Sequence, residues 1–296
     1  MSLDELEYEA PVRLEDLLTH MARLGTKARI LAGGTDLVPA MRKGKVGSGV
    51  TTLVSLKNLP LRYIREDGDG SLRIGSATTH DEIASSPLVN RKAPLLAQGS
   101  SLVGSQQIRN VATIGGNLCN AGPSADTAAP LLALKAELKV VSLRGARLVP
   151  VEQFYRGPSV SCLEPEEVLT EVIIPRLPER TGSWYEKFSP RSYMDLAWVG
   201  VAVLVQLDDR LENFQQVRIG LSAVNPIPMR AKKAEATLMA APVCQEGIEA
   251  AAEVASQECN PNPRSRRVPA AYRREIVRVL TRRLIERAVQ MAREGR

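Results

Sequence analysis

Residues 112–130, ATIGGNLCNAGPSADTAAP, hold the feature on which the fold depends. Two glycines are adjacent at 115 and 116, Pro123 follows, and Asp126 leads into an Ala-rich run that predicts a helix. The stretch has too many small residues for an ordinary core segment and is too apolar for an ordinary loop. Because glycine places no Cβ in the way of a close neighbour, we expect some group to approach this backbone closely.

A second pair of glycines follows a short apolar run, in LAGGTDLVP at 31–39. The backbone N–H groups of such a turn form a concave donor set for phosphate oxygens, and a helix starting there adds its positive end. Two such turns favour a diphosphate and hence a dinucleotide such as FAD. Neither segment carries a P-loop or Rossmann signature. The alternative is that both are simply tight strand-to-helix turns.

Composition limits the class of protein. The chain has 296 residues, 44% hydrophobic and 24% charged, a length that favours two domains. Its start, MSLDELEYEAP, lacks a basic and apolar leader, so we expect a cytoplasmic protein without membrane insertion. The four cysteines are far apart and there are only two histidines, which argues against a metal site.

Patterning predicts the elements around the two turns. A helix is expected at 13–24, a strand at 28–32, a hairpin turning at 67–70, and a helix capped by Thr79. Further elements expected from the pattern are a helix at 93–110, a helix then a strand at 127–143, and a strand at 166–175. The Pro- and Gly-containing segment 176–183 is the predicted domain boundary, followed by strands and then helices.

The C-terminal segment is strongly basic, with eleven arginines against three glutamates over residues 264–296. Apolar residues recur there at helical spacing, which indicates an amphipathic helix with a solvated or partner-covered basic face. The alternative, nucleic-acid binding, lacks stacking aromatics apart from Tyr272.

Three segments together resemble the FAD-binding medium subunit of molybdenum hydroxylases, the flavoprotein of the xanthine and carbon monoxide dehydrogenase type. They are LAGGTDLVPAM (31–41), IRNVATIGGNLCNAGPSADTAAPLLAL (108–134) and YRREIVRVLTRRLI (272–285). The resemblance implies an α+β fold with a p-cresol methylhydroxylase-type FAD-binding domain at 1–176, in two α+β halves of about 1–58 and 59–176. A small α+β domain with a three-stranded sheet and helices would follow at 177–296.

The same resemblance implies a flavin site and assigns no catalytic residue and no metal ligand. Asp126 would contact the cofactor, although a helix N-cap also fits its position, and Lys187 would lie near the flavin unless it is a surface lysine. Tyr193 is either a stacking aromatic or an ordinary loop residue, Cys119 a small buried residue, and His80 a structural one. The cofactor-binding residues implied are Ala32, Gly33, Gly34, Thr35, Asp36, Val103, Gly104, Thr113, Gly116, Asn117, Asn120, Asp126, Leu169 and Lys187.

The resemblance also implies partners. A large molybdopterin-binding subunit would oxidise the substrate, and a small subunit with two 2Fe–2S clusters would relay electrons to FAD. An acceptor such as NAD or a quinone would then take them, in a dimer of heterotrimers. No cysteine-bearing insertion for an extra cluster and no fused partner domain is expected. The alternatives are a free-standing FAD-dependent oxidoreductase and, last, a basic nucleic-acid-binding protein.

Overall fold

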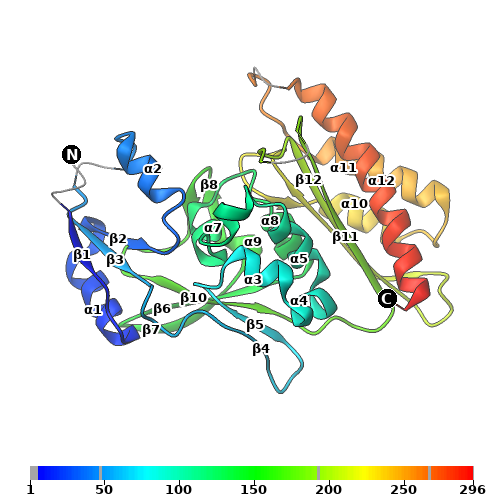
Figure 1. The fold of residues 1–296 in the computed structure, drawn as a ribbon. Helices are drawn as coiled ribbons and strands as arrows, with labels where there is room; N and C mark the ends of the chain where they lie inside the picture. The colour runs from blue at the N-terminus through cyan, green and yellow to red at the C-terminus, as the bar shows by residue number, and fades with distance from the viewer. Residues whose placement is uncertain (1–5, 47–48, 192–193, 266–267, 296) are drawn as a thin grey trace.

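The computed structural model describes residues 6–46, 49–191, 194–265 and 268–295. Three parts follow one another across the molecule in Figure 1, from the blue N-terminal part through the cyan and green centre to the C-terminal part in yellow, orange and red. Helices and sheets contribute to each part, which agrees with the predicted α+β class.

The first part is a small parallel sheet with the order β1-β3-β2, made of Glu7–Glu9, Thr52–Ser55 and Ala28–Leu31. Helix α1 (Leu14–Leu24) confirms the helix predicted at 13–24, and its Leu17, Leu18 and Met21 are buried in the core of this part. The short helices η2 (Gly25–Lys27) and α2 (Leu37–Arg42) flank β2. The glycine turn at 32–36 therefore joins β2 to α2.

The second part is an antiparallel sheet with the order β4-β5-β10-β6-β7. Its first two strands confirm the predicted hairpin. All seven residues of β10, the central strand of this sheet, are buried. The strands are β4 (Ile64–Glu66), β5 (Leu72–Gly75), β6 (Glu137–Ser142), β7 (Gly145–Pro150) and β10 (Val168–Ile174), and a separate short pair is β8 (Tyr155–Gly157) and β9 (Val160–Ser161).

Short helices cover one side of this sheet. Thr79 caps α3 as predicted, in a capping box with Glu82. The helix predicted at 93–110 is wrong in its length: α5 ends at Ser101, Gly104 takes the left-handed φ of +49°, and Ser105 caps a new helix. The helices are α3 (His80–Ser85), α4 (Pro87–Lys92), α5 (Pro94–Ser101), α6 (Gln106–Arg109), α7 (Ile114–Asn120), α8 (Ala128–Ala133) and α9 (Val151–Phe154).

The third part is one antiparallel sheet backed by helices. Its long strands are β11 (Thr181–Phe188), β12 (Val199–Leu207) and β13 (Phe214–Ser222). The prediction of three strands needs a correction, because the two-residue β14 (Met229–Arg230) pairs with the end of β13. A strand this short has no alternating pattern to reveal it. The helices are α10 (Lys232–Met239), α11 (Gln245–Glu258) and α12 (Ala270–Glu294).

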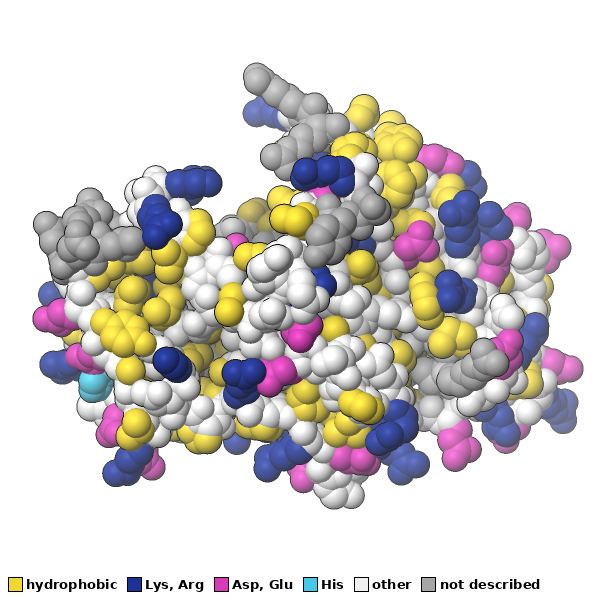
Figure 2. All heavy atoms as spheres, in the orientation of Figure 1, with side chains coloured by type: hydrophobic (Ala, Val, Ile, Leu, Met, Phe, Trp, Pro, Cys, Tyr) yellow, Lys and Arg dark blue, Asp and Glu magenta, His cyan; other side chains and the backbone are white. Residues whose placement is uncertain are grey.

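Strand β12 is covered on both sides. Ala202 and Leu204 belong to the core of the second part, whereas Val201, Val203 and Val205 belong to the core under α10–α12. Both faces of the strand are thus buried, which explains its nearly unbroken apolar sequence. Helix α12 confirms the predicted amphipathic helix, since Val277, Leu280, Leu284 and Ala288 are buried. Figure 2 shows dark blue and magenta side chains mixed over the visible face of this part.

Gly182 allows α12 to pack closely on β11. A Cβ at this position would overlap the Ala288 carbonyl oxygen and lie 2.7 Å from the Ala292 nitrogen. We therefore expect Gly182→Ala to destabilise the protein by about 3 kcal/mol or more, because backbone atoms of a packed helix cannot yield as a side chain can. Gly68→Ala is the control, since a Cβ there meets nothing within 4 Å. Urea denaturation measures both, and equal midpoints for the two variants would contradict this account.

Candidate cofactor-binding site

The first glycine turn presents free backbone donors. Gly34 has a φ of +69°, which only glycine adopts easily, and the turn leads directly into α2. Among the described residues, no hydrogen bond uses the backbone N–H groups of residues 33–36. These groups lie at or near the surface. A concave set of unused N–H donors fits the oxygens of a diphosphate.

The second glycine pair is built differently from the prediction. It forms the first turn of α7, and the N–H groups of residues 114–117 all donate to protein acceptors. These acceptors are the carbonyl oxygens of Thr78, Ser76 and Thr113 and the Thr113 hydroxyl, which caps the helix by accepting from Gly116. The second turn therefore supplies shape and packing to the site, and its backbone donors are not open as the sequence suggested.

The two turns touch each other. A Cβ at Gly33 would overlap the Val111 carbonyl oxygen, and a Cβ at Gly115 would lie 2.7 Å from the Ser76 Cβ. These two glycines are required by contacts within the chain. At Gly116, a Cβ would meet only the Thr113 hydroxyl oxygen at 3.1 Å and the Ala32 Cβ at 3.9 Å. Gly116 is thus the paired glycine whose missing side chain leaves room beside the first turn.

Asp126 lies in a buried ionic cluster. Its Oδ2 accepts from Lys187 Nζ at 2.8 Å and its Oδ1 accepts from the Tyr185 hydroxyl at 3.2 Å. Lys187 Nζ also donates to the Leu102 carbonyl oxygen at 3.1 Å. The alternative of Asp126 as a helix N-cap is wrong, because Thr127 occupies that position in α8. The alternative of a surface lysine is also wrong, since only 7% of the Lys187 side chain is exposed.

Burial controls the protonation of this cluster. It raises the pKa of Asp126 to about 6, while the charge of Lys187 and its hydrogen bond act in the opposite direction. Burial and the neighbouring Asp126 carboxylate raise the pKa of Tyr185. The tyrosine is therefore a neutral donor at physiological pH. The ammonium and carboxylate form a pair of opposite charges largely shielded from water.

The structure places the other predicted residues in several settings. Asn117 Oδ1 accepts from the Thr127 hydroxyl at 2.6 Å, which ties α7 to the start of α8. Asn120 is exposed at the end of α7. Val103 and Gly104 follow Leu102 in the loop between α5 and α6. Leu169 is 3% exposed and packs in the core of the second part, to which Tyr185 also belongs.

Tyr185 is the residue of this cluster that sequence reasoning missed. The signal was present, because residues two apart on a strand share a face and Tyr185 precedes Lys187 on β11 by two. His80 begins α3 with its ring fully buried, and burial lowers its pKa to about 4. Cys119 is exposed as a whole residue, whereas burial raises the pKa of its thiol to about 12, so the expected burial applies to the thiol and not to the residue as a whole. Tyr193 lies outside the described residues.

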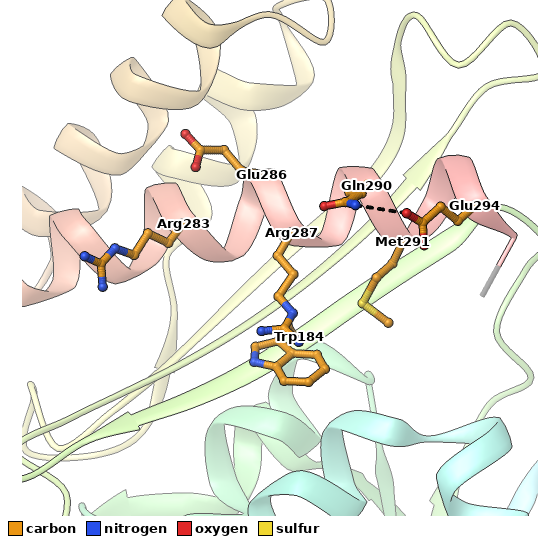
Figure 3. A pocket seen from close by; sticks show the side chains of 7 residues that line it. All are labelled: Trp184, Arg283, Glu286, Arg287, Gln290, Met291 and Glu294. Carbon is orange, nitrogen blue, oxygen red and sulfur yellow. Dashed lines mark hydrogen bonds between the residues drawn. The ribbon is translucent and has the colours of Figure 1, made fainter.

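Other features of the surface lie apart from this cluster. An open hollow of about 560 Å³ lies along α12, lined by side chains of that helix and by Trp184, which is on the face of β11 opposite Tyr185 and Lys187 (Figure 3). There the Arg287 guanidinium stacks over the Trp184 ring, 3.2 Å from its centroid. Within the described ranges, no group of His, Cys, Asp and Glu side chains is arranged to hold a metal ion. No helix in those ranges has the length and apolar character to cross a bilayer.

Comparison with known proteins decides the family. Residues 4–177 match the FAD binding domain in molybdopterin dehydrogenase, and residues 184–288 match the CO dehydrogenase flavoprotein C-terminal domain. The chain belongs to the FAD-binding subunits of the molybdopterin dehydrogenases. It is accordingly a flavoprotein oxidoreductase subunit whose cofactor is FAD, as the resemblance implied.

The similarity to individual relatives covers most or nearly all of the chain. The chain is 35% identical to a putative xanthine dehydrogenase FAD-binding subunit of Escherichia coli, over 98% of each chain. It is 32% identical to the carbon monoxide dehydrogenase medium chain of Hydrogenophaga pseudoflava, over 86% of this chain and 87% of that one. The structure of carbon monoxide dehydrogenase from the same organism matches with a TM-score of 0.90 at 32% identity, covering 97% of this flavoprotein and 98% of the other chain.

The fold is shared with a further solved enzyme. Quinoline 2-oxidoreductase from Pseudomonas putida matches with a TM-score of 0.89 at 27% identity, over 99% of both chains. Together these matches confirm the predicted family, fold class and cofactor.

The buried Asp126–Lys187 pair gives a pH-dependent prediction. Lys187→Met leaves the carboxylate buried without its cation, and removal of one partner of a buried pair costs about 3–5 kcal/mol. We expect a loss of this size at pH 8 and a smaller one at pH 5. The reason is that the pKa of Asp126, already about 6, rises further in the variant, so the carboxyl is protonated and neutral at pH 5.

Urea denaturation at the two pH values measures this difference. In the wild type the raised pKa of Asp126 means that the folded state holds the extra proton, so its contribution to stability decreases as pH rises from about 4 to about 6. Lys92→Met is the control, because Lys92 pairs with Glu66 at the surface. If Lys187→Met lost the same free energy of unfolding at pH 5 and pH 8, the protonation of Asp126 would not depend on Lys187.

Proposed function

We propose that this flavoprotein is the electron-transfer subunit of a molybdenum hydroxylase complex. It takes electrons from 2Fe–2S clusters of a small partner subunit and passes them to an external acceptor such as NAD or a quinone. A large molybdopterin-binding subunit oxidises the organic substrate. The observation that carries this proposal is the match of 86–97% of the chain to the medium chains of carbon monoxide dehydrogenases and the medium subunit of nicotine 6-hydroxylase, together with the fold match to a Cu,Mo-CO dehydrogenase.

The residues present fit FAD. The free N–H groups of residues 33–36 would hold the diphosphate, and the room beside Gly116 would admit the adjoining part of the cofactor. Asn120, the loop at 103–104 and the polar end of Asp126 would border it. We assign this binding role to the domain at 1–176, with the C-terminal domain at 177–296 contributing Lys187. When bound, FAD accepts and releases electrons, and the protein holds it and adjusts its potential.

Lys187 would adjust that potential as one half of a pair. A lone cation near the flavin would stabilise the reduced, more negative form, but the ionised Asp126 carboxylate offsets the charge of Lys187. The pair acts on the flavin as a dipole, and a substitution can remove either of its two charges. The reduction potential of the flavin would thus lie between the value set by Lys187 alone and the value set by Asp126 alone.

Two substitutions should therefore shift the flavin potential in opposite directions. We expect Lys187→Met to lower it and Asp126→Asn to raise it, each by roughly 30 mV, which for a two-electron couple corresponds to ~1.4 kcal/mol. Spectroscopic redox titration of the FAD-loaded protein measures both. The surface substitution Lys92→Met should leave the potential unchanged. Shifts of the same sign in both variants, or none, would remove this role.

Purification of the native complex tests the function itself. We expect the affinity-tagged chain to bring down two further chains, one with molybdopterin and one with 2Fe–2S clusters, in a particle sized as a dimer of heterotrimers. Absorbance, metal analysis and mass measurement identify the components. A yellow protein that oxidises a small donor without partner chains would instead favour a free-standing oxidoreductase. Cell fractionation would test the cytoplasmic location, which the sequence predicts.

A further inference from the structure

The loop at residues 121–127 has little support of its own. Within it, Ala125 donates to the Gly122 carbonyl oxygen at 3.1 Å, and Ala121 donates back to Leu118 at the end of α7. Ala121 itself has a left-handed φ of 48°, which a non-glycine residue rarely adopts. A loop with so few internal hydrogen bonds takes its conformation from what surrounds it.

The C-terminal sheet supplies the surrounding contacts from β11. The Tyr185 hydroxyl and Lys187 Nζ each hold one oxygen of Asp126, near the end of the loop. A Cβ at Gly200, on the neighbouring β12, would lie 3.1 Å from the Tyr185 hydroxyl oxygen, so glycine makes room for this side chain. The contact is buried, and each partner comes from a different part of the molecule.

A second contact reaches the loop from the same end of this sheet, two strands away, since Ser222 of β13 pairs with Gly200 and Gly200 pairs with Lys187. The Ala223 N–H, just after β13, donates to the Pro123 carbonyl oxygen at 2.7 Å. Ala223 has a φ of +65°, a conformation that costs a non-glycine residue roughly 1–2 kcal/mol. Arg273, in the first turn of α12, holds it there by donating from its Nη1 to the Ala223 carbonyl oxygen at 3.0 Å and from its Nη2 to the Ser265 hydroxyl at 3.2 Å.

The second part holds the ends of the loop, through the Ser159 N–H on the Ala121 carbonyl oxygen and Asn117 on the Thr127 hydroxyl, and the C-terminal part holds Pro123 and Asp126 between them. We propose that Tyr185 and Arg273 are positioning residues for FAD. They hold residues 121–127 in the conformation that binds the cofactor. This inference rests on the proposed flavin site. Tyr185 acts through Asp126, and Arg273 acts through Ala223 and Pro123. Neither residue needs to touch FAD, and the C-terminal domain becomes part of the cofactor site.

Tyr185→Phe tests the first contact with the loss of a single oxygen. We expect the dissociation constant of FAD for the apoprotein to rise about tenfold, equivalent to about 1.4 kcal/mol, because the released loop must be ordered by the cofactor. Tyr63→Phe is the matched control, since the Tyr63 hydroxyl also donates to a buried carboxylate, Glu171, but does so in the sheet of the second part. Its FAD affinity should stay within about twofold of the wild type.

Arg273→Gln tests the second contact at a residue farther from Asp126. We expect FAD to bind several-fold more weakly, and the control Arg278→Gln to bind as the wild type does. Arg278 lies on the same helix, carries the same charge and pairs with Glu275 of that helix. If either test variant fails to fold, the other still decides the question, because the two act through different hydrogen bonds.

Hydrogen exchange of the apoproteins gives a readout that does not involve FAD. The amides of Ala125 and Ala223 should exchange faster in Tyr185→Phe and Arg273→Gln than in either control, since both report on the held loop. Unchanged exchange together with unchanged FAD affinity in the two test variants would overturn the positioning role. A wild-type protein that does not bind FAD would overturn the proposed function instead, and the exchange comparison would still report on the loop.

Discussion

Strand β12 belongs to two hydrophobic cores at once, and the arrangement of the site follows from this. Alternate side chains point to opposite faces of a strand, so Ala202 and Leu204 pack with the central helices while the intervening valines pack under α10–α12. The shared strand fixes its neighbour β11 against the central part. The register of β11 then points Tyr185 and Lys187 at Asp126, and a slip of one residue would turn both side chains to the other face.

The buried pair of Asp126 and Lys187 suits a site that must hold a charged cofactor. Two charges removed from water gain little net stability from each other, because desolvation offsets most of their attraction. The pair instead fixes the orientation of the Asp126 side chain, because each carboxylate oxygen accepts from its own donor and the side chain cannot rotate freely. A loop carrying this carboxylate is held in one conformation at a modest cost in stability, and the opposite charges keep the interior nearly neutral.

The sequence was enough to predict most helices and strands and the family. It did not show which acceptor each hydrogen-bond donor of the site contacts. Periodicity was sufficient for α1, the β4–β5 hairpin and α12, since local pattern decides each of them. The break between α5 and α6 was missed because it depends on Gly104 adopting a positive φ within an apolar pattern. Tyr185 shares a strand face with Lys187, which the sequence shows, but its contact with Asp126 joins residues 59 apart in the chain and has no local pattern. Motif similarity assigned Leu169 to the site, and the structure places it in the core cluster that also contains Tyr185.

The two glycine turns look equivalent in the sequence and differ in the structure because of what lies behind them. Behind the second turn, the carbonyl oxygens of Ser76 and Thr78 approach closely enough to take its N–H groups, and Gly115 exists to allow that approach. The first turn also has a carbonyl oxygen beside it, that of Val111 at Gly33, but among the described residues no N–H group of 33–36 donates a hydrogen bond, so these donors stay open. Buried N–H groups need hydrogen-bond acceptors within the protein, whereas N–H groups near solvent can bond to water until a ligand binds. The open donors therefore support the first turn as the proposed anion-binding turn, while the second turn packs beside it.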